Sequence, residues 1–264
     1  MKAIGVFDSG VGGLTVAKEL FNELPYEDII YFGDTARVPY GIKSRETIIK
    51  LSIESILFLL KNDVKLICVA CNTASSVALP EIRNHFKIPL VGVINPAVKE
   101  AVYATRSKRI GVIGTNGTIR SRTYENEIKG LDPSIKVTSS ACPLFVPFAE
   151  EGWFKEKAVK EVARAYLKPI KQAGVDTLIL GCTHYPLLKQ VIKEEMGKGV
   201  VLIDSAKQVA MEVRDTLGSF GLLNKAARNC RHMFYVSDNP EWFKALAKSF
   251  LGQAISSVRK VDNV

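Results

Sequence analysis

Short apolar runs alternate with amphipathic segments along the whole chain. The apolar runs predict strands because they are short and continuous, and they cover residues 3–7, 28–32, 64–70, 89–94, 109–114, 135–140, 175–181, 200–203 and 233–236. The segments between them have the apolar spacing of helices that face a core, at residues 14–24, 44–61, 74–86, 118–129, 155–173, 186–195, 205–217 and 240–251. Asn95-Pro96 is expected to begin a further helix, and Pro25, Gly130 and Gly174 are expected to end helices.

This alternation predicts an α/β fold, because strands without a polar face are typical of mostly parallel sheets that helices cover on both sides. The pattern also repeats within the chain. Residues 4–9 resemble residues 110–115, and residues 64–73 resemble residues 175–184. Two matches in the same order indicate an internal duplication.

The duplication predicts two similar lobes, each a mostly parallel sheet flanked by helices. We expect the first lobe to comprise residues 1–95 with residues 207–264, and the second to comprise residues 96–206. Ligands of open parallel sheets bind beyond the carboxyl ends of the strands, and all four repeated motifs end there. The active site is therefore expected in the cleft between the lobes.

Composition narrows the possible partners. The 264 residues carry a net charge of +9, but the Lys and Arg residues are scattered, and the densest group is Arg106, Lys108 and Arg109. We therefore expect a mild attraction for anions rather than a nucleic-acid partner, although a basic binding protein without catalytic activity stays open as an alternative. No apolar stretch is long enough for a membrane span or a signal-peptide core, so a cytoplasmic protein without a membrane partner is expected.

Two of the five cysteines stand out by their position. Cys68 lies inside an apolar strand, and nothing near Cys142 or Cys230 suggests chemistry, so we interpret these three as packing residues. Cys71 and Cys182 each end a predicted strand and precede polar residues. We expect the helix that follows each of them to lower the pKa of the thiol.

Several chemistries fit these two thiols. Cys68 and Cys71 form a C-x-x-C pair typical of redox proteins, Cys71, Cys182 and His184 can be drawn as a zinc site, and Cys182 with His184 suits a cysteine hydrolase. A racemase fits the duplication best. One thiolate removes a proton from one face of a carbon, and the opposite thiol returns a proton to the other face. Such a reaction needs neither a metal nor a cofactor.

A glycine-rich loop covers residues 8–13, between the first strand and the first helix. It differs from a dinucleotide fingerprint because Thr15 stands where the third glycine should be. Its backbone N–H groups at a helix start suit a carboxylate. Asp8 is either a helix cap or a polar group in the cleft, and Asp34 with Tyr40 and Gly41 lies in a loop after the second strand.

These motifs together resemble the glutamate racemase family of the aspartate/glutamate racemase superfamily. They occur in order over essentially the whole chain, as Phe7-Asp8-Ser9-Gly10-Val11-Gly12-Gly13-Leu14-Thr15, Gly33-Asp34, Pro39-Tyr40-Gly41, Cys71-Asn72-Thr73 and Gly181-Cys182-Thr183-His184-Tyr185-Pro186. Related aspartate racemases share the two cysteines, but their N-terminal loop differs.

The resemblance implies that Cys71 and Cys182 are the acid/base pair and that Asp8, His184 and Glu150 assist them. The neighbouring Glu151 leaves the choice between the two glutamates open. The implied substrate contacts are Asp8, Ser9, Tyr40, Gly41, Asn72, Thr73, Thr115, Thr118, Thr183 and His184.

The resemblance further implies a cofactor-independent conversion of L-glutamate to D-glutamate that supplies peptidoglycan synthesis in the cytoplasm. A homodimer is common in such a family and is expected here. A racemase of aspartate or of another acidic amino acid is the alternative within the superfamily.

Overall fold

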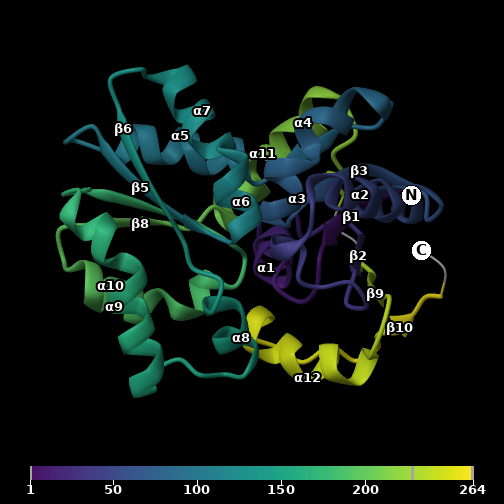
Figure 1. Ribbon diagram of the computed structural model, residues 1–264. Coiled ribbons are helices and arrows are strands. Elements are labelled where there is room, and N and C mark those ends of the chain that lie inside the picture. Colours follow the sequence, from purple (N-terminus) through teal and green to yellow (C-terminus); the bar gives the residue numbers. More distant parts are fainter. Residues whose placement is uncertain (1, 227–228, 263–264) are drawn as a thin grey trace.

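The strands gather into two sheets in which every strand pair is parallel (Figure 1). The structure is a computed structural model, and it describes residues 2–226 and 229–262. The first sheet has the order β10-β9-β2-β1-β3-β4, with β1 (Ala3–Asp8), β2 (Ile29–Gly33), β3 (Val64–Val69), β4 (Leu90–Gly92), β9 (His232–Val236) and β10 (Arg259–Lys260). The second has the order β6-β5-β7-β8, with β5 (Arg109–Gly114), β6 (Lys136–Ala141), β7 (Thr177–Gly181) and β8 (Val201–Ile203).

Helices cover both faces of each sheet. The first sheet is packed between α2 (Arg45–Leu60) with α3 (Asn72–Val77) on one face and α1 (Leu14–Glu23), α11 (Ala206–Ser219) and α12 (Pro240–Leu251) on the other. The second sheet is packed between α5 (Ile94–Ala104) with α7 (Thr123–Leu131) and, on the opposite face, α8 (Phe145–Glu150), α9 (Lys157–Gln172) and α10 (Lys189–Met196). The α/β fold predicted from the sequence is therefore confirmed.

The two sheets share one strand order. The order β2-β1-β3-β4 of the first sheet recurs as β6-β5-β7-β8 in the second. The repeated sequence motifs occupy corresponding strands, β1 with β5 and β3 with β7. The short sequence repeats thus mark equivalent places in two similar lobes.

Strand β1 shows how the core is divided. Ile4 and Val6 pack on the side of α1 and α11, whereas Ala3 and Phe7 pack on the side of α2. A strand whose alternate residues are buried on both faces has no polar face, which explains its continuous apolar sequence. The first of these cores continues into the second lobe through α5, where it includes Val98 and Ala101.

We propose the lobe boundaries predicted from the sequence, residues 1–95 with 207–264 and residues 96–206. Helix α5 packs on β7 and β8 of the second sheet, and α11 packs on α1 of the first lobe, which supports a crossing point on each side of the second lobe. In Figure 1 the yellow α12 runs below the first sheet and reaches toward α8 of the second lobe.

Two predicted helices are broken in the structure. The segment expected to be one helix over residues 118–129 is α6 (Asn116–Ser121) followed by α7, because Arg122 between them adopts a left-handed conformation with φ of 56°. The segment over residues 74–86 is α3, α4 (Leu79–Ile82) and the 3-10 turn η2 (Arg83–His85). Pro80 lies in the first turn of α4, where its missing N–H costs nothing, and it cannot continue the preceding helix.

Other boundaries also differ from the prediction. Helix α5 begins at Ile94, ahead of Asn95-Pro96, and Gly130 lies inside α7 rather than ending it. The residues expected to begin the helix at position 186 form the 3-10 turn η3 (Tyr185–Leu188) before α10. Helix α8, the 3-10 turn η1 (Tyr40–Ile42) and strand β10 have no counterpart in the prediction. None of the described helices combines the length and apolar composition that a bilayer crossing requires.

A buried ion pair ties the segment after α11 to the first sheet. Lys65 Nζ lies 2.7 Å from Glu27 Oε2 and donates to the carbonyl oxygen of Leu222 at 2.6 Å. Glu27 also accepts hydrogen bonds from the backbone and side-chain nitrogens of Asn224, both at 2.8 Å. Both charged side chains are almost completely buried, so each depends on the other for its charge to be tolerated.

We expect Lys65→Met to lower the free energy of unfolding by about 3 kcal/mol, because it leaves the Glu27 carboxylate buried without its cation. Urea unfolding measures the change. Lys2→Met is the matched control, since Lys2 pairs with Asp63 at the exposed end of the same sheet and should change stability little. Equal losses in both variants would show that burial of the pair is unimportant.

Candidate active site

The loops that follow β1, β3, β5 and β7 meet where the two sheets face each other. Parallel strands deliver their following loops to one edge of a sheet, so the repeated motifs of both lobes converge. They enclose a cavity of about 20 Å³, lined by Ser9, Val38, Pro39, Tyr40, Gly41, Cys71, Asn72, Thr73, Thr115, Val146, Cys182, Thr183 and His184. A cavity of this size holds about one water molecule. The cavity must therefore widen before an amino acid can enter.

The predicted site residues are brought together at this cavity. All of them line it except Asp8, Thr118 and Glu150. Thr118 and Glu150 hydrogen-bond to residues that do line it, and Asp8 is the last residue of β1, directly before Ser9. The sequence alone did not indicate Val146, which belongs to the unexpected helix α8.

Cys71 is the residue immediately before α3, and its side chain is buried. Its thiol donates to Ser9 Oγ at 3.5 Å. Burial, with the nearby Asp8 carboxylate as a further cause, raises the pKa of Cys71 to about 12. The expectation of a lowered thiol pKa is wrong for this residue, because desolvation of the thiolate outweighs the short helix that follows. Cys71 is therefore a protonated thiol at neutral pH.

Cys182 has a different environment. Its Sγ lies 3.7 Å from His184 Nδ1, and His184 Nε2 lies 3.0 Å from Glu150 Oε1. Burial disfavours the charged imidazole, but the hydrogen bonds and charges of Cys182 and Glu150 outweigh it and raise the pKa of His184 to about 10. The imidazolium therefore donates from both nitrogens at neutral pH. Glu151, by contrast, is exposed, so the geometry selects Glu150.

Asp8 lies fully buried beneath the glycine-rich loop. Its Oδ2 accepts the N–H of Gly10 at 2.8 Å, and its Oδ1 has no hydrogen-bond partner among the described residues. Burial raises the pKa of Asp8, although His184 and the loop N–H groups act in the opposite direction. The Asp8 side chain does not cap α1, whose N-cap is Gly13, so the first of the two roles considered from the sequence is wrong.

The glycine-rich loop touches the second lobe directly. A Cβ on Gly12 would stand 2.3 Å from Thr183 Oγ1 and 2.6 Å from the ring of His184. Only glycine leaves room for this contact. The loop therefore brings the first lobe against the motif that follows β7.

Three threonine hydroxyls form a triangle across the two lobes. Thr73 Oγ1 lies 2.9 Å from Thr115 Oγ1 and 3.2 Å from Thr118 Oγ1, and the last two are 3.1 Å apart. Thr73 belongs to the first lobe, and the other two come from the start of α6. Each hydroxyl can turn from its neighbours to a ligand, because a hydroxyl both donates and accepts.

The hydroxyl of Tyr40 is engaged elsewhere. It donates to Asp34 Oδ2 at 2.5 Å, and Asp34 also accepts from Arg37 and Ser237. The neighbouring Gly41 packs against Thr115 of the second lobe. Tyr40 therefore shapes the cavity wall, while its hydroxyl belongs to a network behind that wall.

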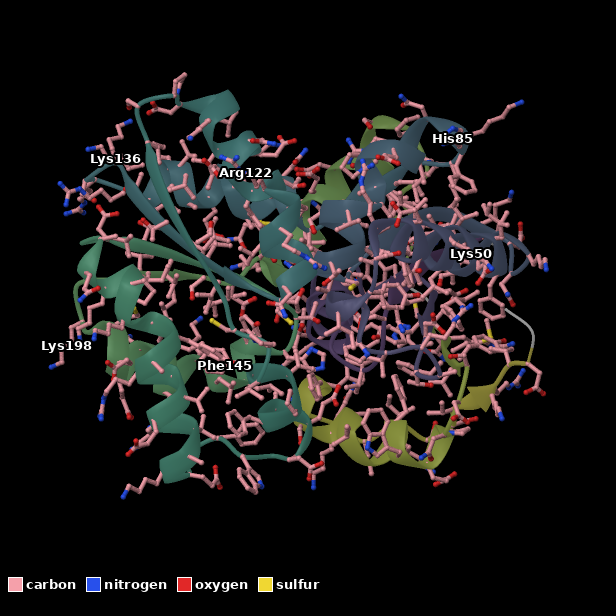
Figure 2. The ribbon with its side chains drawn as sticks, in the orientation of Figure 1. Lys50, His85, Arg122, Lys136, Phe145 and Lys198 are labelled. Carbon is pink, nitrogen blue, oxygen red and sulfur yellow. The ribbon has the colours of Figure 1, made fainter. Side chains whose placement is uncertain are left out.

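Two of the other chemistries considered for the cysteines, the zinc site and the redox pair, find no support. Among residues 2–226 and 229–262, no group of three His, Cys, Asp or Glu side chains is placed to hold a metal ion. Cys68 belongs to the core on one face of the first sheet and Cys71 to the core on the other, and the five cysteines form no disulfide in the described structure. Figure 2 shows Lys50, Lys136 and Lys198 at separate places on the outline of the molecule, in line with a diffuse positive charge.

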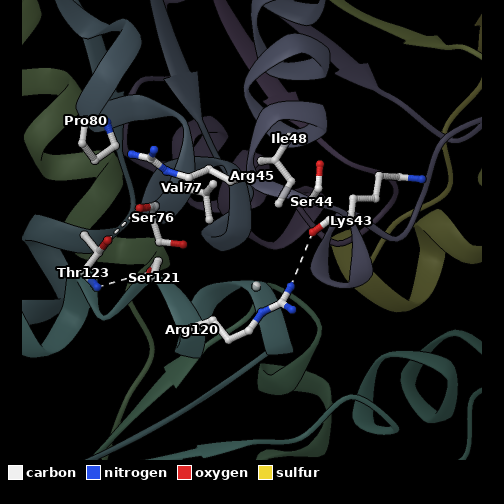
Figure 3. Close-up of a pocket in the computed structure, with 11 residues that line it drawn as sticks. Lys43, Ser44, Arg45, Ile48, Ser76, Val77, Pro80, Arg120, Ser121 and Thr123 are labelled. Carbon is white, nitrogen blue, oxygen red and sulfur yellow. Dashed lines mark hydrogen bonds between the residues drawn. The ribbon is translucent and has the colours of Figure 1, made fainter.

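A larger cavity of about 350 Å³ lies between the lobes outside the site (Figure 3). Lys43 and Arg45 line it from the first lobe, and Arg120 and Thr123 line it from the second. Its lining residues include no thiol, carboxylate or imidazole group.

Comparison with known proteins agrees with this geometry. A sequence profile described as Asp/Glu/Hydantoin racemase matches residues 12–213. The chain is 52% identical to the glutamate racemase of Geobacter metallireducens, over 99% of this chain and 97% of that protein. It is 45% identical to the glutamate racemase of Bacillus cereus, over 98% of this chain and 97% of that protein.

Solved structures give the same result. The crystal structure of glutamate racemase isoform RacE1 from Bacillus anthracis matches with a TM-score of 0.95 and 41% identity, over 99% of this chain and 97% of that one. The glutamate racemase of Francisella tularensis in complex with D-glutamate matches with a TM-score of 0.93 and 40% identity, over the same shares. The chain therefore belongs to the glutamate racemases of the Asp/Glu/hydantoin racemase family.

Proposed function

We propose that this protein interconverts L- and D-glutamate by a two-base proton transfer between Cys71 and Cys182. The observation that supports it most is that these thiols come from opposite lobes and line one cavity. One sulfur takes the α-proton as a base, and the other gives a proton to the opposite face of the carbon. For the other enantiomer the two roles reverse, so the enzyme needs no cofactor.

The α-proton of an amino acid is very weakly acidic, so the carbanion-like state must be stabilised. Hydroxyls and backbone N–H groups aimed at the α-carboxylate stabilise the charge that develops there. The threonine triangle and the glycine-rich loop supply such donors. The closed cavity strengthens them, because water is excluded when the lobes meet.

The two thiols are poised differently. The imidazolium of His184 places a positive charge beside Cys182. Cys71 is held as a thiol by burial. Cys71 is therefore ready as an acid before the substrate binds, and Glu150 keeps His184 charged.

The proposed cellular role is the supply of D-glutamate for peptidoglycan from the cytoplasm, by an enzyme that acts as a homodimer. The relatives named glutamate racemase support the substrate. An aspartate racemase homologue from Pyrococcus horikoshii shares the fold at 19% identity and a TM-score of 0.57, which says nothing about the substrate.

The assay that tests the substrate follows the loss of optical activity of L-glutamate and of L-aspartate in parallel by circular dichroism. No pyridoxal phosphate is added, and a chelator is present. We expect rapid racemisation of glutamate and at least a hundredfold lower activity on aspartate. The reverse preference would assign the alternative substrate, and inactivity on both would overturn the proposal.

We expect Cys71→Ala and Cys182→Ala each to lower racemisation by more than a thousandfold, because each removes one of two essential proton carriers. In D₂O each variant should still exchange the α-proton of one enantiomer only, a different one in each case, which NMR detects. Cys68→Ala is the control, since that buried thiol lies in the core away from the cavity. Racemisation that survives in either active-site variant would contradict the mechanism.

His184 should remain protonated at pH 7.5, because its pKa is raised to about 10. NMR of ¹³C-labelled histidine measures this, and His232, whose pKa is lowered by burial, is the internal control. Glu150→Gln should bring the pKa of His184 down. Because the folded-state pKa is raised, the imidazolium stabilises the fold fully below about pH 6.5, and this contribution is lost as the pH rises toward 10. Titration of His184 near pH 6.5 in the unsubstituted protein would refute the imidazolium.

A further inference from the structure

The break between α6 and α7 turns two side chains of the second lobe toward the first. Arg122 in its left-handed conformation ends α6, and Thr123 and Tyr124 follow as the first residues of α7. Thr123 Oγ1 donates to the carbonyl oxygen of Ser76 in α3 at 2.6 Å, as Figure 3 shows beside the larger cavity. The first turn of α7 is thus docked on α3 of the other lobe.

Tyr124 lies deeper in the same junction, and only 3% of its surface is exposed. Its hydroxyl accepts a hydrogen bond from Asn72 Nδ2 at 2.8 Å. Its ring lies 3.1 Å from the place that a Cβ on Gly181 would occupy. Tyr124 therefore touches the residue after Cys71 and the residue before Cys182, which lie on opposite lobes.

The hydrogen bond fixes the amide of Asn72. An amide group has an NH₂ end that donates and a carbonyl oxygen that accepts. With one N–H of the NH₂ end held by Tyr124, the carbonyl oxygen of Asn72 is left as an acceptor for a ligand in the cavity that it lines. The α-ammonium group of an amino acid is a donor that such an oxygen can accept from, whereas a reversed amide would present hydrogens to a cation.

We propose that Tyr124 is a positioning residue that orients the Asn72 amide for the α-ammonium group of the substrate when the lobes close. The inference rests on the proposed racemase function and deepens it. Tyr124 acts through Asn72 and not on the reacting atoms. Burial raises the pKa of Tyr124, so the hydroxyl stays neutral at physiological pH and does not take part in proton transfer.

The test is Tyr124→Phe, which keeps the ring on Gly181 and removes only the hydroxyl. We expect KM for both enantiomers of glutamate to rise about tenfold while kcat changes less than threefold, because one buried hydrogen bond that orients a ligand contact is lost. Glutarate has the two carboxylates of glutamate without the amino group. Its inhibition constant should therefore change less than twofold.

Two further variants separate positioning from simple support of the junction. Thr123→Val removes the neighbouring hydrogen bond between the lobes, and it should leave KM within twofold of the unsubstituted enzyme. In an Asn72→Ala background, Tyr124→Phe should cost nothing more, because the residue through which it acts is gone. Asn72→Leu should by itself raise KM for glutamate more than the inhibition constant of glutarate, which tests the idea if Tyr124→Phe fails to fold.

A glutarate constant that rises as much as KM would overturn the inference, and so would an equal loss in Thr123→Val. Either result would give Tyr124 a structural role only. If the unsubstituted chain racemises aspartate instead, the same test runs with aspartate and succinate, so a wrong substrate does not affect it. A chain inactive on both acids overturns the proposed function and this inference with it.

Discussion

Burial of ionisable groups between two facing sheet edges is the constraint on which this site depends. Asp8, Cys71 and His184 are all shielded from water, and burial opposes the charged form of each. Only His184 escapes this effect, because Cys182 and Glu150 hold its charge from both sides. In the closed site, His184 is charged because its partners stabilise the charge, whereas the thiol of Cys71 has no such partner and stays neutral.

The same closure that sets these protonation states also excludes the substrate. A cavity with room for about one water molecule must widen to admit an amino acid, so the contacts that line it have to rearrange during turnover. The threonine triangle suits this cycle. Its three hydroxyls satisfy one another in the closed structure and can pass to a carboxylate without being left unpaired.

The features that could be predicted from the sequence are those that depend on the pattern of apolar and polar residues along the chain. The strand ends that carry Cys71 and Cys182 could be located because buried strands and their following loops have a clear signature. The direction in which a side chain points, and the surroundings of each ionisable group, could not be predicted in this way. The hydroxyl of Tyr40 turns to Asp34 of its own loop, and the thiol of Cys71 is harder to ionise than expected because of burial and of Asp8, which is distant in the sequence. Tyr124 lies in a segment that the sequence predicted as one continuous helix. No nearby residue indicated that Arg122 would adopt a left-handed conformation and break that helix.

Duplication supplied two thiols at equivalent places, yet their neighbours differ. The second residue after Cys71 is Thr73, whereas the second residue after Cys182 is His184, and the carboxylate of Asp8 at the end of β1 has only Gly114 as its counterpart on β5. This asymmetry cannot favour one enantiomer at equilibrium, because mirror-image substrates have equal free energy in water. For a racemase, kcat/KM must therefore be the same for both enantiomers. The asymmetry can only change how that ratio is made up of KM and kcat in each direction. Selection could therefore tune the two halves of the site separately without changing the product ratio.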